Sequence, residues 1–191
     1  MNVIGQSLKR KEDRALVVGR GRYLDDFALA DMLHLGVVRS THAHARLGKV
    51  IVDEALALPG VVAAFTAVDL PELEEAIPGY GQLKSFRDYE QPVLVRSKVR
   101  YVGEPIAALV ADTAYHLADA LARVTVEYED LPVATSTASA LPSGPRIHEA
   151  WPDNVAGISQ RSVGEPESAM RTADVIVHER VHHARSAGIP I

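Results

Sequence analysis

The sequence predicts an α+β fold in which helices cover a small sheet. Three neighbouring stretches support this class. Residues 106–111 are six apolar residues in a row, a pattern typical of a strand that is buried on both faces. Residues 113–124 then have helical periodicity, and residues 124–128 alternate apolar and polar side chains. Strand, helix and strand in this order indicate one main β-α-β unit, whose two strands we expect to be parallel with a right-handed crossover.

The helix of this unit has a defined start and a defined apolar face. Asp112 or Thr113 can cap its N-terminus, because both side chains can accept a backbone hydrogen bond. Leu117, Leu121 and Val124 recur at helical spacing and form one stripe. We therefore expect this stripe to face the sheet, giving one helical layer on one sheet.

Other elements are expected on both sides of this unit. Strands are predicted over residues 31–39, 48–53 and 61–66, and a short helix over residues 53–58 is ended by Pro59 and Gly60. Residues 69–92 are a polar insert with little structure of its own, and residues 131–152 are an extended connection. A short helix begins near Pro166, and residues 174–185 alternate like an antiparallel strand with an open edge.

The composition excludes several classes of function. With 191 residues the chain can bury a core, and its net charge of −5 argues against a nucleic-acid partner. No cysteine is present, which excludes a disulfide scaffold, a thiol nucleophile and an iron–sulfur cluster held by this chain. No apolar run approaches the length of a membrane span and the N-terminus does not resemble a leader peptide, so a cytoplasmic protein is expected.

Several residue groups suggest chemistry but favour a structural interpretation. His42 and His44 would share one face of a strand, as a metal pair requires, yet no third ligand lies at a supporting spacing. Residues 19–22, Gly-Arg-Gly-Arg, lack the context of a phosphate loop, and the functional alternative is an arginine contact to an acidic neighbouring subunit. Glu104 lies between Gly103 and Pro105 at the mouth of a strand, where we expect it to interact with backbone amides or Arg100.

Four stretches resemble one protein family. Residues 100–105, Arg-Tyr-Val-Gly-Glu-Pro, followed by a small apolar strand, resemble the α/β hammerhead domain of the molybdopterin-binding large subunit of the xanthine dehydrogenase, aldehyde oxidase and carbon monoxide dehydrogenase family. Residues 19–26, 39–46 and 126–132 resemble further motifs of that domain, in the family's order. The resemblance implies structural or interface roles for Arg22, Tyr23, Asp26, Arg39, His42, His44, Arg100, Tyr101, Gly103, Glu104 and Pro105.

The resemblance also implies an organisation and a function. We expect an N-terminal segment over residues 1–14, the hammerhead domain over 15–135, and a linker with a C-terminal arm over 136–191 that leads toward a molybdopterin-binding domain. No catalytic, cofactor-binding or metal residue of the family falls on this chain. The parent assembly would use molybdopterin with molybdenum, 2Fe–2S clusters and FAD.

The chain is therefore expected to be a non-catalytic structural piece, split or truncated, of a molybdenum hydroxylase large subunit. Its partners would be the molybdopterin-binding remainder, an iron–sulfur small subunit and an FAD subunit, and a homo-oligomer is a further possibility. An independent binding module on the same fold, without redox activity, is the alternative. A free-standing hydrolase that uses a histidine site is the least favoured interpretation, because no spacing selects a triad.

Overall fold

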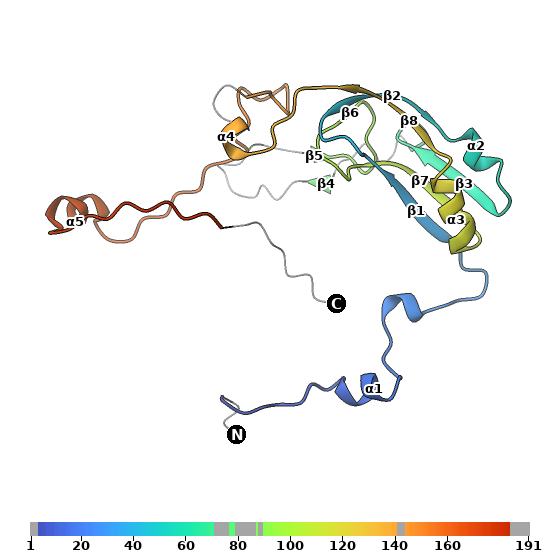
Figure 1. Cartoon of the computed structure of the whole chain (residues 1–191), viewed down its shortest axis with the longest axis horizontal. Helices are drawn as coiled ribbons and strands as arrows, with labels where there is room; N and C mark the ends of the chain where they lie inside the picture. Colours follow the sequence, from blue (N-terminus) through green and yellow to red (C-terminus); the bar gives the residue numbers. More distant parts are fainter. Residues whose placement is uncertain (1–3, 71–76, 79–86, 88–89, 141–143, 184–191) are drawn as a thin grey trace. The chain divides into compact units, whose positions relative to one another are not determined.

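The computed structural model describes residues 4–70, 77–78, 87, 90–140 and 144–183. The chain divides into two compact units, one formed by Met1–Gly81 with Asp88–Asn154 and the other by Gln82–Arg87 with Val155–Ile191. The strands and the helices that pack on them belong to the first unit (Figure 1).

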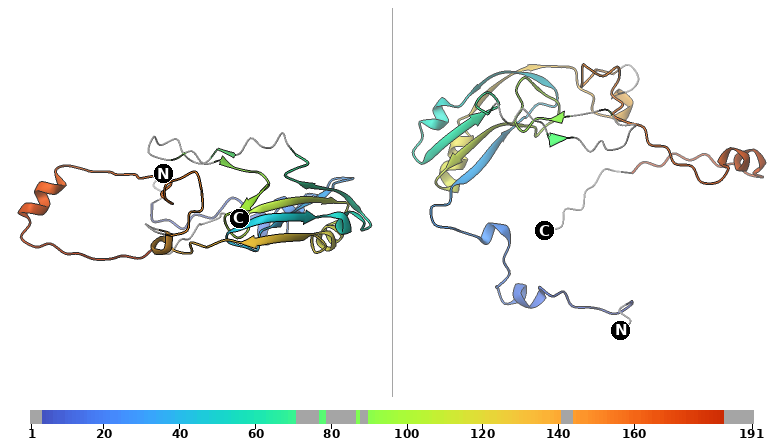
Figure 2. Two further views of the ribbon diagram at one scale, coloured as in Figure 1. Left: turned by 90° about the horizontal axis from the view of Figure 1, so that it is seen from above. Right: turned by 180° about the vertical axis from the view of Figure 1, so that it is seen from behind.

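Two three-stranded antiparallel sheets form the first unit. One has the order β1 (His34–Arg39), β7 (Pro105–Ala111), β3 (Val61–Thr66). The other has the order β6 (Lys98–Val99), β2 (Ala45–Ile51), β8 (Thr125–Asp130), and the views of Figure 2 show these strands from two further sides. A small pair joins β4 (Ile77–Pro78) to β5 (Glu90–Gln91). The α+β class predicted from the sequence is confirmed.

The prediction that the two strands of the β-α-β unit are parallel strands of one sheet is wrong. Strand, helix and strand do follow one another as β7, α3 (Ala114–Leu121) and β8, but β7 and β8 belong to different sheets. Each pairs antiparallel with strands distant in the sequence, β7 with β1 and β3, and β8 with β2. The sequence pattern shows that each segment is a strand, but the choice of partner depends on contacts far along the chain.

The predicted helix cap and apolar stripe are confirmed. Thr113 Oγ1 accepts a hydrogen bond from His116 N at 3.1 Å, which satisfies one of the free amides at the start of α3. Leu117 is buried, and Leu121 and Val124 pack against the same core cluster. A side chain at Gly36 of β1 would clash with Leu117 and Leu121, so this glycine allows the helix to approach the sheet closely.

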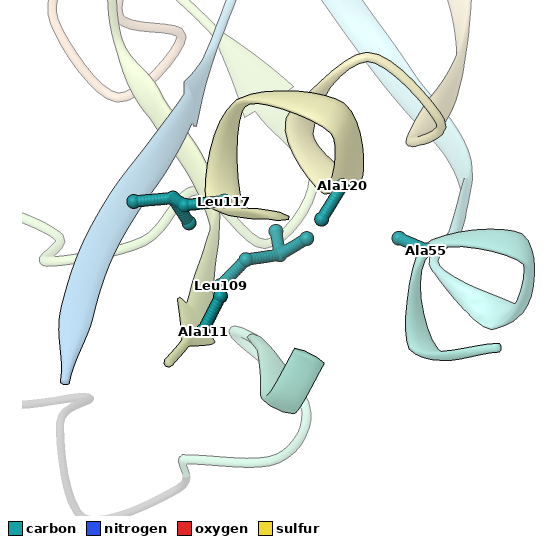
Figure 3. Close-up of a cluster of buried hydrophobic side chains, with 5 residues drawn as sticks. All are labelled: Ala55, Leu109, Ala111, Leu117 and Ala120. Atoms are coloured by element: carbon teal, nitrogen blue, oxygen red, sulfur yellow. The ribbon is translucent and has the colours of Figure 1, made fainter. Parts of the chain in front are cut away.

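The first core cluster lies between this sheet and its helices. It consists of the buried residues Ala55, Leu109, Ala111, Leu117 and Ala120 (Figure 3). Ala55 comes from α2 (Asp53–Leu56), which ends two residues earlier than the predicted helix over 53–58. Gly60 follows with a φ of 78°, a left-handed conformation that glycine adopts without strain, and leads the chain into β3.

The second core cluster belongs mainly to the other sheet. It joins the buried residues Ala45, Val95, Val99 and Ile106, with partly buried residues of β2 and β8 packed against them. Strand β7 therefore contributes to both clusters, through Leu109 in the first and Ile106 in the second. This double burial explains why residues 106–111 are apolar without interruption.

The bounds of other elements differ modestly from the predictions. Strand β3 is confirmed at residues 61–66, whereas β1 begins at His34 and β2 runs from Ala45 to Ile51. The connection after β8 contains a short helix α4 (Thr137–Ala140), and α5 (Pro166–Thr172) has the predicted proline in its first turn. The insert over residues 69–92 lies mostly outside the described residues.

The two ends of the chain contain little buried surface. Residues 4–33 form only α1 (Asp13–Val17) and the 3-10 turn η1 (Leu24–Asp26), and none of them is buried. The predicted strand over residues 174–185 is wrong for its described part, since residues 174–183 are exposed and form no strand. An alternating sequence forms a strand only where another strand accepts its hydrogen bonds, and no described strand pairs with it.

Candidate functional site

The candidate site is the corner between β6 and β7, at residues 100–105. Gly103 has a φ of 92°, which turns the chain sharply before Pro105 opens β7. The corner is joined to the end of β1 by two backbone bonds: Gly103 N donates to Ser40 O at 2.8 Å, and Ser40 N donates to Glu104 O at 2.9 Å. Arg39 adds a side-chain bond from Nη1 to Gly103 O at 2.9 Å.

Glu104 is the central carboxyl of this corner and is completely buried, with 0% of its surface exposed. Its Oε2 accepts a hydrogen bond from Arg100 N at 2.5 Å, so the expected contact with a backbone amide is confirmed. Burial raises the pKa of Glu104, and the bond from Arg100 N and the charge of Arg100 oppose this shift. An enclosed carboxyl cannot reach a substrate, so this geometry favours a structural role.

His44 lies in the turn before β2 rather than in a strand. Its side chain is buried, and Nδ1 lies 2.7 Å from Pro132 O. Because a carbonyl oxygen can only accept, Nδ1 carries the proton and donates it, which connects this turn to the chain beyond β8. Within the described part of the chain, three buried atoms of this neighbourhood lack a hydrogen-bond partner: His44 Nε2, Arg100 Nε and Glu104 Oε1.

His42 contacts different groups from those that His44 contacts. Its ring stacks on Tyr128 of β8 with 4.0 Å between the ring centroids, and its Nε2 lies 3.5 Å from Asp130 Oδ1. The strand geometry on which the metal-pair hypothesis depended is therefore absent, because the two histidines precede β2. Among the described residues no group of three potential ligands could hold a metal ion.

The structure gathers seven of the eleven residues implied by the family motifs near the corner, stacks His42 on Tyr128 of β8, and leaves the other three in the N-terminal segment. The gathered residues are Arg39, His44, Arg100, Tyr101, Gly103, Glu104 and Pro105. The other group stays in the N-terminal segment: Tyr23 N donates to Asp26 Oδ2 at 2.8 Å, and the Arg22 guanidinium lies 5.8 Å from the centre of the Phe27 ring.

Tyr101 of the corner has a side-chain partner of its own. Its hydroxyl oxygen accepts a hydrogen bond from Gln91 Nε2 at 2.5 Å, and burial raises the pKa of this hydroxyl.

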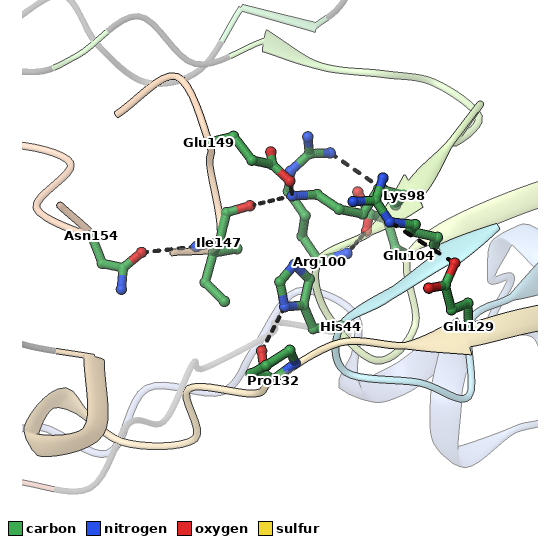
Figure 4. A network of polar contacts seen from close by, with 10 residues as sticks. His44, Lys98, Arg100, Glu104, Glu129, Pro132, Ile147, Glu149 and Asn154 are labelled. Atoms are coloured by element: carbon green, nitrogen blue, oxygen red, sulfur yellow. Dashed lines mark hydrogen bonds and ion pairs between the residues drawn. The ribbon is translucent and has the colours of Figure 1, made fainter. Parts of the chain in front are cut away.

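Lys98 and its partners were not found from the sequence. Lys98 Nζ donates to Ile147 O at 2.9 Å and contacts the Glu149 carboxylate, so that a buried ammonium is paired with a segment about 50 positions away (Figure 4). The lysine pairing lowers the pKa of Glu149 to about 2, and burial lowers that of His148 to about 4. The only available signal was the alternation of Lys98 with Val99 and Arg100, which does not identify a partner.

The fold and this corner define a hammerhead-type domain, and comparison with known proteins agrees. Residues 18–132 match the family model described as "Aldehyde oxidase and xanthine dehydrogenase, a/b hammerhead domain". The chain therefore belongs to the aldehyde oxidase and xanthine dehydrogenase family.

Two curated relatives and a solved structure illustrate the similarity. The chain is 33% identical to the nicotine 6-hydroxylase large subunit of Paenarthrobacter nicotinovorans over 190 residues, which are 100% of this chain and 23% of the relative. It is 36% identical to the carbon monoxide dehydrogenase large chain of Hydrogenophaga pseudoflava, covering 77% of this chain and 18% of that one. Quinoline 2-oxidoreductase from Pseudomonas putida 86 superposes with a TM-score of 0.78 at 36% identity, over 91% of this chain and 22% of that chain.

The chain thus spans less than a quarter of the length of each of these three proteins. The sequence supplies no cysteine for an iron–sulfur cluster, and the described residues supply no set of metal ligands. No helix in the described ranges is long and apolar enough to cross a membrane.

Proposed function

We propose that this chain is a non-catalytic structural part of a molybdenum hydroxylase large subunit. Its role would be to pack against the molybdopterin-binding polypeptide and the iron–sulfur part of the enzyme, in an assembly that also contains an FAD subunit. The family match and the fraction of each relative that the chain covers support this proposal. In this proposal residues 15–135 are the hammerhead domain and residues 136–191 are the linker and arm, in a cytoplasmic assembly.

The observation that carries the proposal is the exposed apolar surface of the two chain ends. Large apolar side chains of residues 4–33 and 158–183 are exposed, whereas a monomer usually scatters such residues singly. They are Ile4, Leu8, Val17, Val18, Tyr23, Leu24, Phe27, Leu29, Met32 and Leu33 in the first segment, and Ile158, Val163, Met170, Val175, Ile176, Val177 and Val181 in the second. A partner that covered these side chains would recover the hydrophobic free energy that the isolated chain lacks.

Co-purification tests the proposal. An affinity-tagged chain expressed in its native host should bring down a larger polypeptide together with molybdenum and iron, measured by mass spectrometry of proteins and metals. A variant with Val175→Asp and Val177→Asp should lose these partners, because two charges would enter the apolar contact. The melting transition of the variant should match that of the parent, since both positions are exposed.

A matched control keeps the test specific. Replacement of Glu165 and Glu167 by Gln removes two negative charges from the same unit and leaves every apolar side chain unchanged, so the partners should stay bound. Recovery of the tagged chain alone, without metal or a larger polypeptide, would instead favour an independent binding module.

A further inference from the structure

Residues 144–154 fold into a compact segment, which we call the clasp. Asn154 makes two bonds inside it: Oδ1 accepts from Ile147 N at 3.0 Å, and Nδ2 donates to Pro145 O at 2.9 Å. A further bond from Nδ2 to Ala140 O, also at 2.9 Å, ties the clasp to the end of α4. The rings of His148 and Trp151 stack with 4.3 Å between their centroids. The clasp is therefore an ordered piece of the first unit although it contains no regular strand or helix.

Lys98 connects the clasp to the sheet. Its side chain is only 6% exposed, and its Nζ donates to Ile147 O and contacts the carboxylate of Glu149, which is 64% exposed. Both of these partners lie in the clasp, as Figure 4 shows. A buried ammonium is costly unless it is paired, so opening the clasp would leave the Lys98 charge without its compensating groups.

The position of the clasp in the chain gives this contact a consequence. The clasp ends at Asn154, and the second unit resumes at Val155. Residues 155–191 are thus covalently attached to the first unit through the clasp, whereas the other piece of the second unit, Gln82–Arg87, is joined to the first unit separately along the chain. Holding the attachment point of residues 155–191 in one conformation reduces the conformational entropy that these residues lose when they bind another chain.

We propose that Lys98 is a positioning residue, which holds the clasp on the first unit so that the second unit is presented to a partner polypeptide from a restricted set of conformations. This inference rests on the proposed function, because it assigns the contact a role in partner binding. It predicts that removal of the Lys98 charge loosens the clasp and weakens binding, although Lys98 does not touch the partner.

The absence of cysteine from the sequence allows a direct test of the clasp. Asp119→Cys on α3 and Pro152→Cys in the clasp are both at exposed positions of the first unit, and spin labels there report their distance distribution by electron paramagnetic resonance. The distribution should be narrow in this labelled parent and should broaden on Lys98→Met, which removes the charge and keeps much of the apolar stem. Lys98→Arg should restore a narrow distribution, because it keeps a donor cation.

Two further variants control for general effects. Lys49→Met makes the same change at an exposed position of β2 and should leave the distribution narrow. Glu149→Gln removes the negative charge that faces Lys98 but keeps an oxygen acceptor, so it should broaden the distribution less than Lys98→Met does. This exposed substitution keeps the test valid even if the buried one prevents folding. An unchanged distribution for Lys98→Met and Glu149→Gln would overturn the inference.

The binding measurement uses the large polypeptide that co-purifies with the tagged chain. The dissociation constant for that polypeptide should rise about tenfold for Lys98→Met and return toward the parent value for Lys98→Arg. A clasp that opens while the dissociation constant stays unchanged would overturn the positioning role and leave the proposed function standing. A parent chain that binds no such polypeptide would overturn both, whereas the spin-label result would still show whether Lys98 holds the clasp.

Discussion

Glu104 shows how a single side chain stabilises the corner between β6 and β7. Its carboxyl is fully buried and accepts the amide proton of Arg100. Replacing it by glutamine keeps an oxygen acceptor for this amide, whereas Glu104→Ala leaves the amide without a partner. We expect Glu104→Ala to lower the free energy of unfolding by about 1–3 kcal/mol, and Glu104→Gln to lower it less.

The pH dependence of stability, compared between the parent chain and Glu104→Gln, tests the protonation of Glu104. Burial raises its pKa above the ordinary value of 4.5, so the folded state holds a proton that the unfolded state releases. The stability that the folded state gains from holding this proton is fully present below pH 4.5, and it is lost as the pH rises through the folded-state pKa of Glu104. Denaturant titrations at several pH values should show this loss in the parent and not in Glu104→Gln, with the exposed substitution Glu12→Gln as control.

The pH dependence of stability that His148 contributes has the opposite sign to that of Glu104. Burial, with the charges of Arg100 and Lys98, lowers its pKa from 6.5 to about 4. Between these values the unfolded state takes up a proton that the folded state does not, so His148 should make the protein less stable as the pH falls from 6.5 toward 4. His148→Phe keeps a ring to stack on Trp151 and cannot titrate, so its denaturation midpoint should depend less on pH in this range. Equal slopes for parent and variant would contradict the lowered pKa.

At the scale of elements, the packing of α3 on the sheet β1-β7-β3 is the contact most open to a test. Leu121 packs against the buried cluster of Leu109, Leu117 and their neighbours. We expect Leu121→Asp to destabilise the protein by about 2–4 kcal/mol, since it places an unpaired charge against an apolar core. Thermal denaturation measures the effect, and Ala118→Asp adds the same charge on the exposed side of α3 as a matched control. A melting temperature that changes equally in both variants would mean that the helix faces the sheet differently.

At the scale of the whole molecule, the exposed apolar side chains of the two ends predict association. The isolated chain should form oligomers in a concentration-dependent way, because such side chains favour contact with any apolar surface. Light scattering over a concentration series should show a rising average mass, and Val175→Asp with Val177→Asp should reduce the rise. A parent chain that stays monomeric at high concentration, with residues 158–183 protected from protease, would show that the chain covers these residues itself.

Metal content gives a second test at this scale. The sequence has no cysteine and the described residues offer no metal-ligand group, so the isolated chain should retain neither molybdenum nor iron after dialysis against a chelator. It should likewise not reduce dye acceptors with purines, aldehydes or carbon monoxide. Elemental analysis of the dialysed protein measures the first outcome, and stoichiometric metal in that sample would contradict the proposed non-catalytic role.

The sequence by itself determined the features that depend on near neighbours in the chain. The apolar run of β7, the Thr113 cap and the proline in the first turn of α5 each follow from residues a few positions apart. The backbone contact of Glu104 belongs to the same class, since Arg100 precedes it by only four positions. Local hydrogen bonds and side-chain periodicity act over this range, which is why these features could be predicted.

Only the tertiary structure decided which distant segments meet. The separation of β7 and β8 into two sheets depends on pairing with β1, β3 and β2, and the partners of Lys98 lie 49 and 51 positions away. Residues 174–183 carry a strand-like alternation and yet form no strand, because a strand requires a partner for its backbone groups. Periodicity specifies which face of a segment is apolar, but the surface that covers that face is chosen by competition among all segments of the folded chain.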